Sequence, residues 1–393
     1  MRQSRVPMLA GVIAALSVVS SAAGQTKVAL SKPDAESKES FTRVTAVREL
    51  PSGKVLVVDQ QDKVVQLVDL ASGTMTKVGR EGQGPGEYGL PLTLLGLPSG
   101  ETLVFDMAGR RFLTIGVDGK PGAVLEMPRA PAATGQAGPI VSFGFTIPRG
   151  IDSKGRIYFE GSPFTPTGGS ADSVPILRWD RVKPVFDTVG YLTLPKGSAV
   201  ASGGGGRFSV QIGGGKVWTP AEAWDVAGDG RVARLTPSPY RVIWLDAGKA
   251  TPGPVQPYTP IKVTEADKAL YKVNLAKAPR IQMTFGGPGG GTRSSSTPQS
   301  GPPQAEPEFS ETMPPFTGRG AVLATPEGEA WVLRTRPASD KVPTYDVFDR
   351  TGALVKKVML NPSSRVVGFG KGTVYVARID DDDLQYLQRY KKP

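Results

Sequence analysis

The sequence predicts an all-β protein, a six-bladed β-propeller of four-stranded antiparallel blades with one short helix and one disordered insert. Among the 393 residues are 49 glycines and 36 prolines, a composition that favours turns and short strands. The pattern Pro-Ser-Gly-x-x-Leu-Val-x-Asp occurs twice, and weaker copies of its turn bring the number to six. Units of about 40 to 50 residues with four strands each are typical of propeller blades. The six turn glycines are Gly53, Gly100, Gly155, Gly230, Gly328 and Gly372.

The first unit divides into four strands at its turn signals. Its β-branched valines favour strands over a surface helix. The Pro-Ser-Gly and Ser-Gly turns separate the segments, and the second unit, which ends near residue 126, repeats the same order. We predict strands at Thr45–Leu50, Lys54–Asp59, Val64–Asp69 and Thr74–Val78.

Two of the longer intervals between these turns contain extra segments: a loop-rich insertion with "ASGGGGRFS" and "GGGKVWTP" between Gly155 and Gly230, and a helix candidate with a low-complexity insert between Gly230 and Gly328. A helix is predicted over Thr264–Lys277, because Thr264 can cap it and a proline follows it. Ala266, Leu270 and Val273 share one face of this helix, which we expect to pack on the propeller. The insert Gly286–Pro303 consists mostly of Gly, Pro and Ser and is predicted to be disordered. One propeller domain, residues 35–393, then contains both segments.

The N-terminal segment, residues 1–24, reads as a signal peptide. Arg2 and Arg5 precede an apolar run, Met8–Val19, and small residues follow it as a cleavage site. The run is too short for a membrane span. We therefore expect an exported protein, periplasmic or extracellular, that has no membrane span and is a monomer. The net charge of +11 would suit acidic polymers, but we favour simple solubility, and no run of lysines and aromatics indicates nucleic-acid binding.

The chain has no cysteine and no histidine. Disulfides, thiolate metal sites, cysteine nucleophiles and Ser-His-Asp triads are therefore excluded. Catalysis would have to use carboxylates, lysine, tyrosine or a hard cation held by oxygen atoms. These absences are the strongest negative evidence in the sequence.

The stretch Gly79–Tyr88, "GREGQGPGEY", has alternating glycines like a phosphate-binding loop. It lacks a following helix, and Pro85 removes an amide donor, so a dinucleotide fingerprint is excluded. This stretch and the blade core "PSGETLVFD" resemble bacterial exported six-bladed propellers related to NHL-repeat proteins. The resemblance covers about residues 41–390 and implies a six-bladed propeller, but little settled function. NHL-type lyases hold a metal with histidine, so their activity is not implied here.

The candidate binding residues lie on two segments. The polar and aromatic residues of the glycine-rich stretch would reach the channel mouth, although we favour a structural role for it as a tight crossover from blade one to blade two. Two tryptophans near the loop-rich insertion are candidates for a binding surface, whereas Trp244 and Trp331 are expected in the core. The candidates are Arg80, Glu81, Glu87, Tyr88, Trp218 and Trp224.

The acidic run Asp380–Asp383 is the densest carboxylate cluster. Calcium is conceivable there, but adjacent aspartates on an extended chain point in different directions, so we favour a solvated loop. We expect no cofactor and no catalytic residue. The leading hypothesis is a module that binds a protein or carbohydrate partner. The alternative is a carboxylate-based, calcium-dependent propeller enzyme of the lactonase or glycan lyase type.

Overall fold

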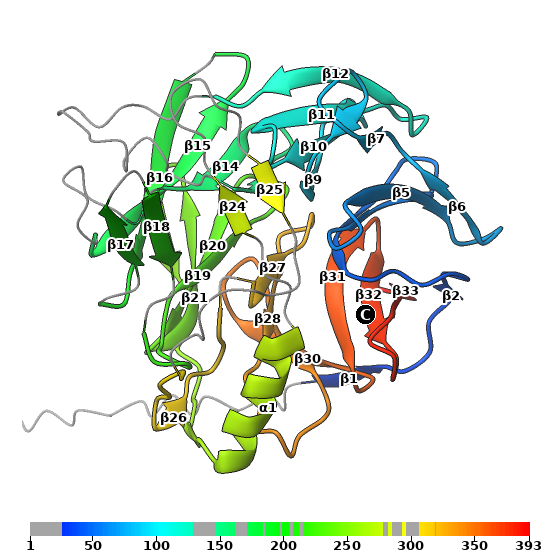
Figure 1. Cartoon of the computed structure of the whole chain (residues 1–393). Helices are drawn as coiled ribbons and strands as arrows, with labels where there is room; N and C mark the ends of the chain where they lie inside the picture. The colour runs from blue at the N-terminus through cyan, green and yellow to red at the C-terminus, as the bar shows by residue number, and fades with distance from the viewer. Residues whose placement is uncertain are drawn as a thin grey trace, which may run out of the picture.

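The computed structural model is a ring of six blades around a central axis (Figure 1). It describes residues 26–128, 147–161, 163, 171–183, 185–196, 199–204, 207–212, 215–277, 282–284, 293–295, 306–318 and 320–393. The predicted signal peptide lies outside these residues. So does most of the predicted disordered insert, of which only Arg293–Ser295 is described, as a strand. Within the described residues, no helix is long and apolar enough to cross a membrane.

Blades 1 to 4 each consist of four antiparallel strands in chain order from the axis outwards. Blade 1 has β3 (Val44–Glu49), β4 (Val55–Asp59), β5 (Val64–Asp69) and β6 (Thr74–Lys77). Blade 2 has β9 (Pro91–Gly96), β10 (Thr102–Asp106), β11 (Arg111–Ile115) and β12 (Pro121–Glu126). Blade 3 has β13 (Pro148–Ile151), β14 (Ile157–Glu160), β15 (Ser173–Asp180) and β16 (Val185–Thr193). Blade 4 has β19 (Ala223–Val226), β20 (Val232–Pro237), β21 (Tyr240–Asp246) and β22 (Lys249–Pro252).

Blades 5 and 6 each include a strand from the N-terminal end of the described chain. Blade 5 has β27 (Val322–Ala324), β28 (Ala330–Leu333), β29 (Thr344–Phe348) and β30 (Leu354–Leu360), with β1 (Thr26–Leu30) added in parallel outside β30. Blade 6 has β31 (Ser364–Gly370), β32 (Thr373–Ile379) and β33 (Gln385–Lys391), and β2 (Ala35–Glu36) is its fourth strand. Figure 1 shows the blue N-terminal strands beside the orange and red C-terminal ones. The pairing of these N-terminal strands with the last two blades closes the ring. Strand β1 lies before residue 35, the predicted start of the domain.

The remaining elements belong to the connections. They are β7 (Arg80–Glu81) with β8 (Glu87–Tyr88), β17 (Ala199–Gly204) with β18 (Arg207–Ile212), β23 (Ile261–Lys262) with β26 (Thr312–Met313), and β24 (Gln282–Thr284) with β25 (Arg293–Ser295). Helix α1 spans Glu265–Lys277, as predicted. Thr264 and Asp267 exchange hydrogen bonds as a capping box, with Thr264 N 2.7 Å from Asp267 Oδ2.

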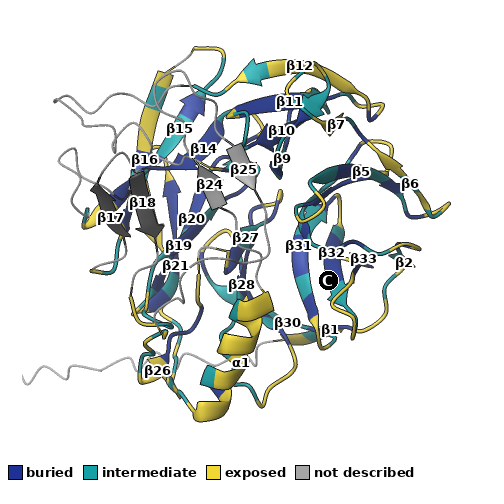
Figure 2. Ribbon diagram, viewed as in Figure 1, coloured by how far each residue is buried: buried dark blue, intermediate teal, exposed yellow. Residues whose placement is uncertain are grey.

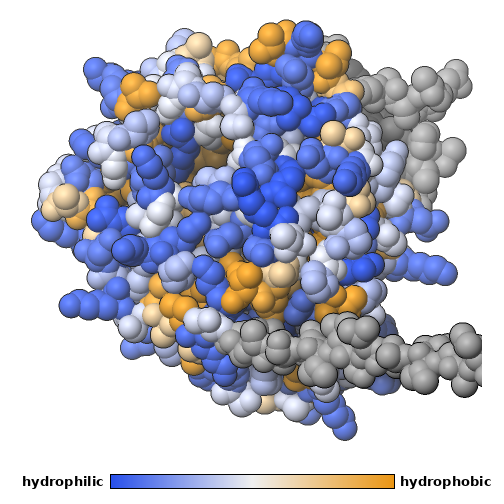
Figure 3. All heavy atoms as spheres, turned by 180° about the vertical axis from the view of Figure 1, so that it is seen from behind, coloured by the Kyte–Doolittle hydropathy of each residue, from blue (hydrophilic) through white to orange (hydrophobic). Residues whose placement is uncertain are grey.

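The hydrophobic core lies between the blades. The described residues form six clusters, one between each pair of adjacent blades, including the pair formed by blades 6 and 1. Figure 2 shows buried strands in the blades and exposed residues on α1 and the peripheral loops. Seen from behind, the described surface is mostly hydrophilic, with apolar side chains in separate patches (Figure 3). Stability therefore comes from face-to-face burial of neighbouring sheets.

The six predicted turn glycines each join the first and second strands of a blade. All have positive φ, from +70° at Gly372 to +91° at Gly100, a conformation that favours glycine. We call the end of the ring that carries these turns the turn face. The opposite end, where the inner strands begin, is the mouth face. The predicted strands of blade 1 match β3 to β6 within one residue at each end.

The predicted packing face of α1 is wrong. Leu270 is 40% exposed and Val273 is 53% exposed, and Ala266 is also exposed, whereas Asp267 is buried. The reason is that α1 is held by specific contacts at the mouth face and not by an apolar stripe. Asp267 Oδ1 accepts a hydrogen bond from Ala338 N at 2.6 Å.

Candidate functional site

The glycine-rich stretch is the crossover from β6 of blade 1 to β9 of blade 2, as predicted. Its two short strands, β7 and β8, pair in parallel and close the loop on itself. Gly82 has φ +155°, and a Cβ there would lie 2.1 Å from Oε2 of Glu87. The glycines therefore make room for a side chain of the same loop, and not for a phosphate.

Glu87 is used by this loop. Its Oε2 accepts a hydrogen bond from Gly84 N at 2.7 Å, and its Oε1 lies 2.7 Å from Nε of Arg80. The Gly84 amide, followed by Arg80, lowers the pKa of the Glu87 carboxyl. Arg80 and Glu81 are exposed, with Glu81 Oε1 3.4 Å from Nζ of Lys63. Of these predicted candidates, Arg80 and Glu81 alone are open to solvent.

Two predicted binding residues, Tyr88 and Trp224, are buried instead. The Tyr88 side chain lies between blades 1 and 2, where its hydroxyl donates to Val78 O at 2.9 Å and accepts from Val65 N at 3.0 Å. Trp224 belongs to β19 and lies between blades 3 and 4, and its Nε1 donates to Oε2 of Glu160 at 3.0 Å. Each is 1% exposed, so they do not form the predicted binding surface. Both side chains instead pack between adjacent blades.

Trp218 is half-buried and packs against the helix. Its ring centroid lies 5.8 Å from that of Tyr271 in α1 and 5.4 Å from that of Phe309. Lys277, in the last turn of α1, also pairs with Asp383 of blade 6 at 2.8 Å. The contacts of Trp218 and Lys277 together anchor α1 to the mouth face. Trp244 and Trp331 are buried, as predicted.

The mouth face contains two buried carboxylates with the same task, Asp59 and Asp106. They are the aspartates of the two Pro-Ser-Gly-x-x-Leu-Val-x-Asp repeats. Asp59 accepts hydrogen bonds from the amides of Thr42 and Arg43 at 2.7 and 3.0 Å. Asp106 accepts from the amides of Gly89 and Leu90 at 3.1 and 2.9 Å. Each carboxylate thus fixes the chain that enters its own inner strand, a structural use of the motif.

A third buried carboxylate, Asp346 of β29, forms an ion pair. Its Oδ2 lies 2.7 Å from Nη1 of Arg334 and accepts the hydroxyl of Tyr240 at 2.9 Å. Asp346 is fully buried, and its Oδ1 has no hydrogen-bond partner. The guanidinium of Arg334 also lies over the rings of Tyr240 and Tyr258, at 5.4 and 5.1 Å. Blade 5 therefore presents one arginine that is already paired.

Two further arginines meet where the ring closes, and the sequence did not single them out. Arg365, in β31 of blade 6, donates through Nη2 to Val44 O and to Oε1 of Gln385, the latter at 3.0 Å. Arg43 directly precedes Val44 and stands at the start of blade 1. Burial lowers the pKa of Arg43 and of Arg365, and the charge of Arg43 lowers that of Arg365 further. Arg365 thus reaches the backbone carbonyl of the residue that follows Arg43, at the junction of blades 6 and 1.

Arg336 completes this group from blade 5. It follows β28, and its Nε donates to Asp340 O at 3.2 Å. Burial raises the pKa of Tyr345, whereas the charges of Arg365 and Arg336 both oppose that effect. Tyr345 in turn accepts a hydrogen bond from Val366 N at 3.0 Å, which joins blades 5 and 6. We call Arg43, Arg336 and Arg365 the mouth arginines. Within the described residues, no carboxylate forms an ion pair with any of them.

Asp225 is a carboxylate of an inner strand with a raised pKa. It lies on β19, where burial raises the pKa of its carboxyl although Arg149 and two backbone amides oppose this. Its Oδ2 accepts from Ala324 N of blade 5 at 2.8 Å. Raised carboxyl pKa values in a propeller interior are a property of acid catalysts as well as of structural pairs.

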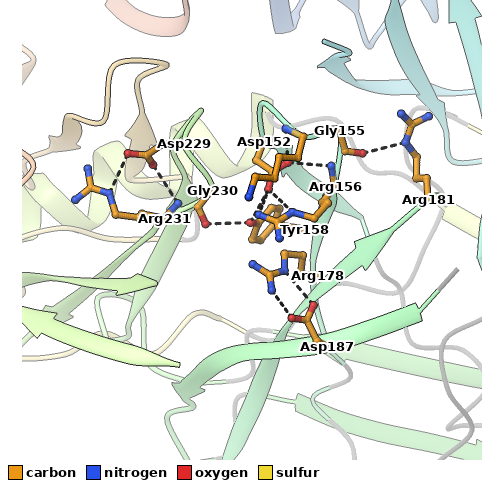
Figure 4. Close-up of polar contacts among 11 residues, drawn as sticks. Asp152, Gly155, Arg156, Tyr158, Arg178, Arg181, Asp187, Asp229, Gly230 and Arg231 are labelled. Carbon is orange, nitrogen blue, oxygen red and sulfur yellow. Dashed lines mark hydrogen bonds and ion pairs between the residues drawn. The ribbon is translucent and has the colours of Figure 1, made fainter. Parts of the chain in front are cut away.

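The turn face carries a separate polar network (Figure 4). Asp152 is buried, and its Oδ2 lies 2.7 Å from Nη2 of Arg156 and 3.0 Å from the hydroxyl of Tyr158, which also lies 2.9 Å from Gly230 O. Burial, together with the Asp152 charge, raises the pKa of Tyr158. This network joins blade 3 to blade 4.

The same network extends to both sides. Asp229 pairs with Arg231 and Arg350, each at 3.0 Å, and so ties blade 4 to blade 5. Arg178 pairs with Asp187 on the outer strands of blade 3. All of these carboxylates are engaged, which indicates a structural role for the turn face.

Calcium binding, which the sequence left conceivable, has little support from the arrangement of the carboxylates. Across the residues that the structure describes, no three Asp or Glu side chains gather as ligands for an ion. Asp380–Asp383 form the exposed turn between β32 and β33, as favoured from the sequence, with Oδ1 of Asp380 accepting the amides of Asp382 and Leu384. This turn does not bring its carboxylates together.

Comparisons with known proteins give the following results. No protein-family model matches the chain, and no curated protein matches it in sequence. The chain is similar in structure to regucalcin, a calcium-binding protein from Agrobacterium tumefaciens (9% identity, 93% of this chain, 97% of that one, TM-score 0.41). It is also similar to a gluconolactonase from Xanthomonas campestris (8%, 93% and 95%, TM-score 0.40) and to virginiamycin B lyase from Staphylococcus aureus (11%, 88% and 80%, TM-score 0.35).

These similarities do not extend to function. Such low identities, with TM-scores from 0.35 to 0.41, say nothing about the chemistry of this chain. The resemblance to NHL-repeat proteins stays a prediction, since no family model matches. The chain is a six-bladed β-propeller, and its function has to be argued from its own residues.

Proposed function

We propose that this chain is an exported binding module that holds its ligand at the mouth face of the propeller. One observation carries the proposal. The buried carboxylates of the mouth face are occupied by the fold, whereas the mouth arginines have no carboxylate partner within the described residues. The occupied carboxylates are Asp59, Asp106, Glu160 and Asp346.

Acid and base catalysis requires carboxyl groups that can exchange protons with a substrate. Asp59 and Asp106 each accept two backbone amides, and their loss would leave those amides buried without partners. Such groups stabilise loops and do not serve as free catalysts. Unpaired arginines at the rim of a ring are suited to recognition. Binding therefore fits this face better than hydrolysis.

One observation favours the alternative of a carboxylate-based enzyme. Asp225 lies on an inner strand and has a raised carboxyl pKa, as an acid catalyst would. Among the residues described, no group of three carboxylates is available for calcium. The enzyme hypothesis therefore rests on Asp225.

The test compares turnover with binding in the chain that lacks residues 1–24. An aldonolactone, an aryl glycoside and an aryl phosphate should each react no faster than in buffer. Turnover that is lost in Asp225→Asn, and kept in the exposed control Asp246→Asn, would replace the binding proposal with the enzyme one.

Binding is measured separately as the shift in Tm with a panel of sugars, sugar acids and small organic acids. At least one compound should raise Tm. Arg336→Gln should reduce that effect, as should Thr335→Val at the residue before it, whose buried Oγ1 has no hydrogen-bond partner. Arg350→Gln on the turn face is the control and should retain it. A panel in which no compound is sensitive to the mouth-face variants would contradict the proposal.

A further inference from the structure

Some arginines of the ring pair with a carboxylate, whereas others, such as Arg48 and Arg181, bond only to neutral oxygen atoms, and the mouth arginines belong to the second group. Arg156, Arg231, Arg334 and Arg378 each pair with a carboxylate at 2.7 to 3.0 Å. Arg365 reaches only the oxygen atoms of Val44 and Gln385, and Arg336 reaches only Asp340 O. The guanidinium of Arg43 donates no hydrogen bond to any described residue. Three positive charges therefore collect at one junction with no protein anion between them.

The junction is built by three blades. Arg43 enters blade 1, Arg365 lies at the start of the inner strand of blade 6, and Arg336 follows the second strand of blade 5. The Tyr345 hydroxyl accepts the amide next to Arg365, and Arg365 itself contacts the carbonyl next to Arg43. These contacts connect Arg365 with blades 1 and 5 at the mouth face, the charge of Arg336 acts on the same Tyr345, and all three arginines are half-buried.

Half-buried positive charges in mutual proximity are costly unless an anion accompanies them. The lowered pKa values of Arg43 and Arg365 express that cost. A protein that gains nothing from such a cluster would usually place a carboxylate within it, as blade 5 does with Asp346 and Arg334. The arrangement indicates that the compensating charge comes from outside the chain.

Unsatisfied polar atoms accompany the arginines. Thr45 Oγ1 lies two residues after Arg43, and Thr335 Oγ1 lies directly before Arg336; both are buried without a hydrogen-bond partner, as is Oδ1 of Asp346. The two hydroxyl donors thus lie on the segments that carry Arg43 and Arg336, whereas the Asp346 carboxylate faces Tyr240 and Arg334 between blades 4 and 5. Buried polar atoms of this kind are expected to bind either water or ligand.

We propose that the ligand of the mouth face is a small molecule with an oxyanion group, either a carboxylate or a phosphate. Arg43, Arg336 and Arg365 hold this group where the ring closes, an inference that rests on the proposed binding function. Guanidinium groups offer paired donors that match the oxygen atoms of such groups. The unpartnered hydroxyls of Thr45 and Thr335 could donate to the oxyanion or accept from a hydroxyl group of the same molecule. A polyhydroxy acid fits this set of groups.

The experiment uses matched probes and calorimetry on the chain without residues 1–24. D-galacturonate and D-galactose differ in the carboxylate, and inorganic phosphate tests the oxyanion without the sugar. Galacturonate should bind at least about tenfold more tightly than galactose, and its affinity should fall as ionic strength rises from about 0.05 to about 0.2 M.

Arg43→Gln is the sharpest variant, because its side chain makes no contact that the fold needs. It should weaken galacturonate binding about tenfold, and because it removes one of the uncompensated charges it should not lower the Tm of the free protein. Arg365→Lys keeps the charge and loses the paired donors, so it should weaken binding as well. Arg350→Gln, an exposed arginine of the turn face, should leave binding unchanged.

Two outcomes would overturn the inference. In the first, galactose and galacturonate bind with equal affinity, Thr335→Val weakens the binding of both, and Arg43→Gln weakens neither. That result would keep the binding site and reject recognition of an oxyanion. Absence of binding by galacturonate and phosphate, or binding that Arg43→Gln and Arg350→Gln weaken alike, would reject specific recognition by the mouth arginines. The proposed function would then still be decided by the neutral members of the panel.

Discussion

Removing the hydroxyl of Tyr88 separates the two roles that the glycine-rich crossover can have. Tyr88→Phe keeps the buried ring and its contacts, so no cavity forms. It removes one oxygen atom that donates to Val78 O at 2.9 Å and accepts from Val65 N at 3.0 Å. Both groups are backbone atoms in the core between blades 1 and 2.

A buried backbone group without a partner costs about 1 to 3 kcal/mol. Because two groups lose their partner, Tyr88→Phe should lower the free energy of unfolding by about 2 to 6 kcal/mol. The lower half of that range is favoured if Val78 O finds a second donor. Ligand binding by the folded protein should not change, since Tyr88 is 1% exposed.

The assay is urea unfolding followed by tryptophan fluorescence, which suits a chain with five tryptophans. Tyr191→Phe is the matched control, because Tyr191 is 56% exposed, and it should change stability by less than about 0.5 kcal/mol. If unfolding is irreversible, unfolding rates replace the equilibrium values. A Tyr88→Phe protein as stable as the parent but impaired in ligand binding would refute the structural assignment.

Two further changes test the loop and the helix. Gly82→Ala places a Cβ on the Glu87 carboxylate, so it should lower the free energy of unfolding in urea by about 1 to 3 kcal/mol. Adding Glu87→Ala should recover part of that loss. If the effects of the two substitutions simply add, the predicted clash is contradicted. Burial would raise the pKa of Asp267, but hydrogen bonds from Thr264 and Ala338 outweigh it and lower the pKa. The contribution of the Asp267 carboxylate to stability is therefore present above its unfolded pKa near 4 and is lost as pH falls through its folded pKa. Asp267→Asn should be about 1 kcal/mol less stable than the parent at pH 7 and equally stable in acid. A stability difference that does not depend on pH would reject this assignment.

The fold followed from local signals, because each blade begins with a turn that only certain residues adopt easily. Gly53 and Gly372 both have positive φ, and the valines beside them form buried second strands. Such signals repeat in the sequence and need no knowledge of distant contacts. The strand limits of blade 1 were predictable for that reason.

The closure of the ring had no local signal. The short strand β2 pairs with β33, which lies at the opposite end of the chain. The added strand β1 pairs in parallel with β30, a contact that hydrophobic alternation cannot predict. Long-range pairing of short strands is decided by the completed ring, and not by propensity.

The candidate site was predicted less well for a related reason. Tyr88 and Trp224 were chosen as aromatic residues near loops, but their strands place them between blades. Arg43 and Arg365 were missed because they lie near opposite ends of the chain, although each stands at the start of an inner strand before a valine. That repeated position was the available signal. It gains meaning only when the blades are arranged in a ring.

The position of the mouth arginines links ligand binding to the integrity of the ring. Closure depends on a few backbone contacts, such as Ser37 N to Leu387 O at 2.9 Å and Phe41 N to Gln385 O at 2.7 Å. Arg43 belongs to the segment that forms them, and Arg365 contacts it from the other side. The two arginines carry the same charge on the two sides of the closure, so an oxyanion held by both would favour the closed ring. A ligand at 100 times its Kd would stabilise the closed ring by about 2.7 kcal/mol. Such a ligand should therefore protect the amides of Ser37 and Phe41 from hydrogen exchange more than those of blade 3, whereas equal protection of all blades would place the ligand elsewhere.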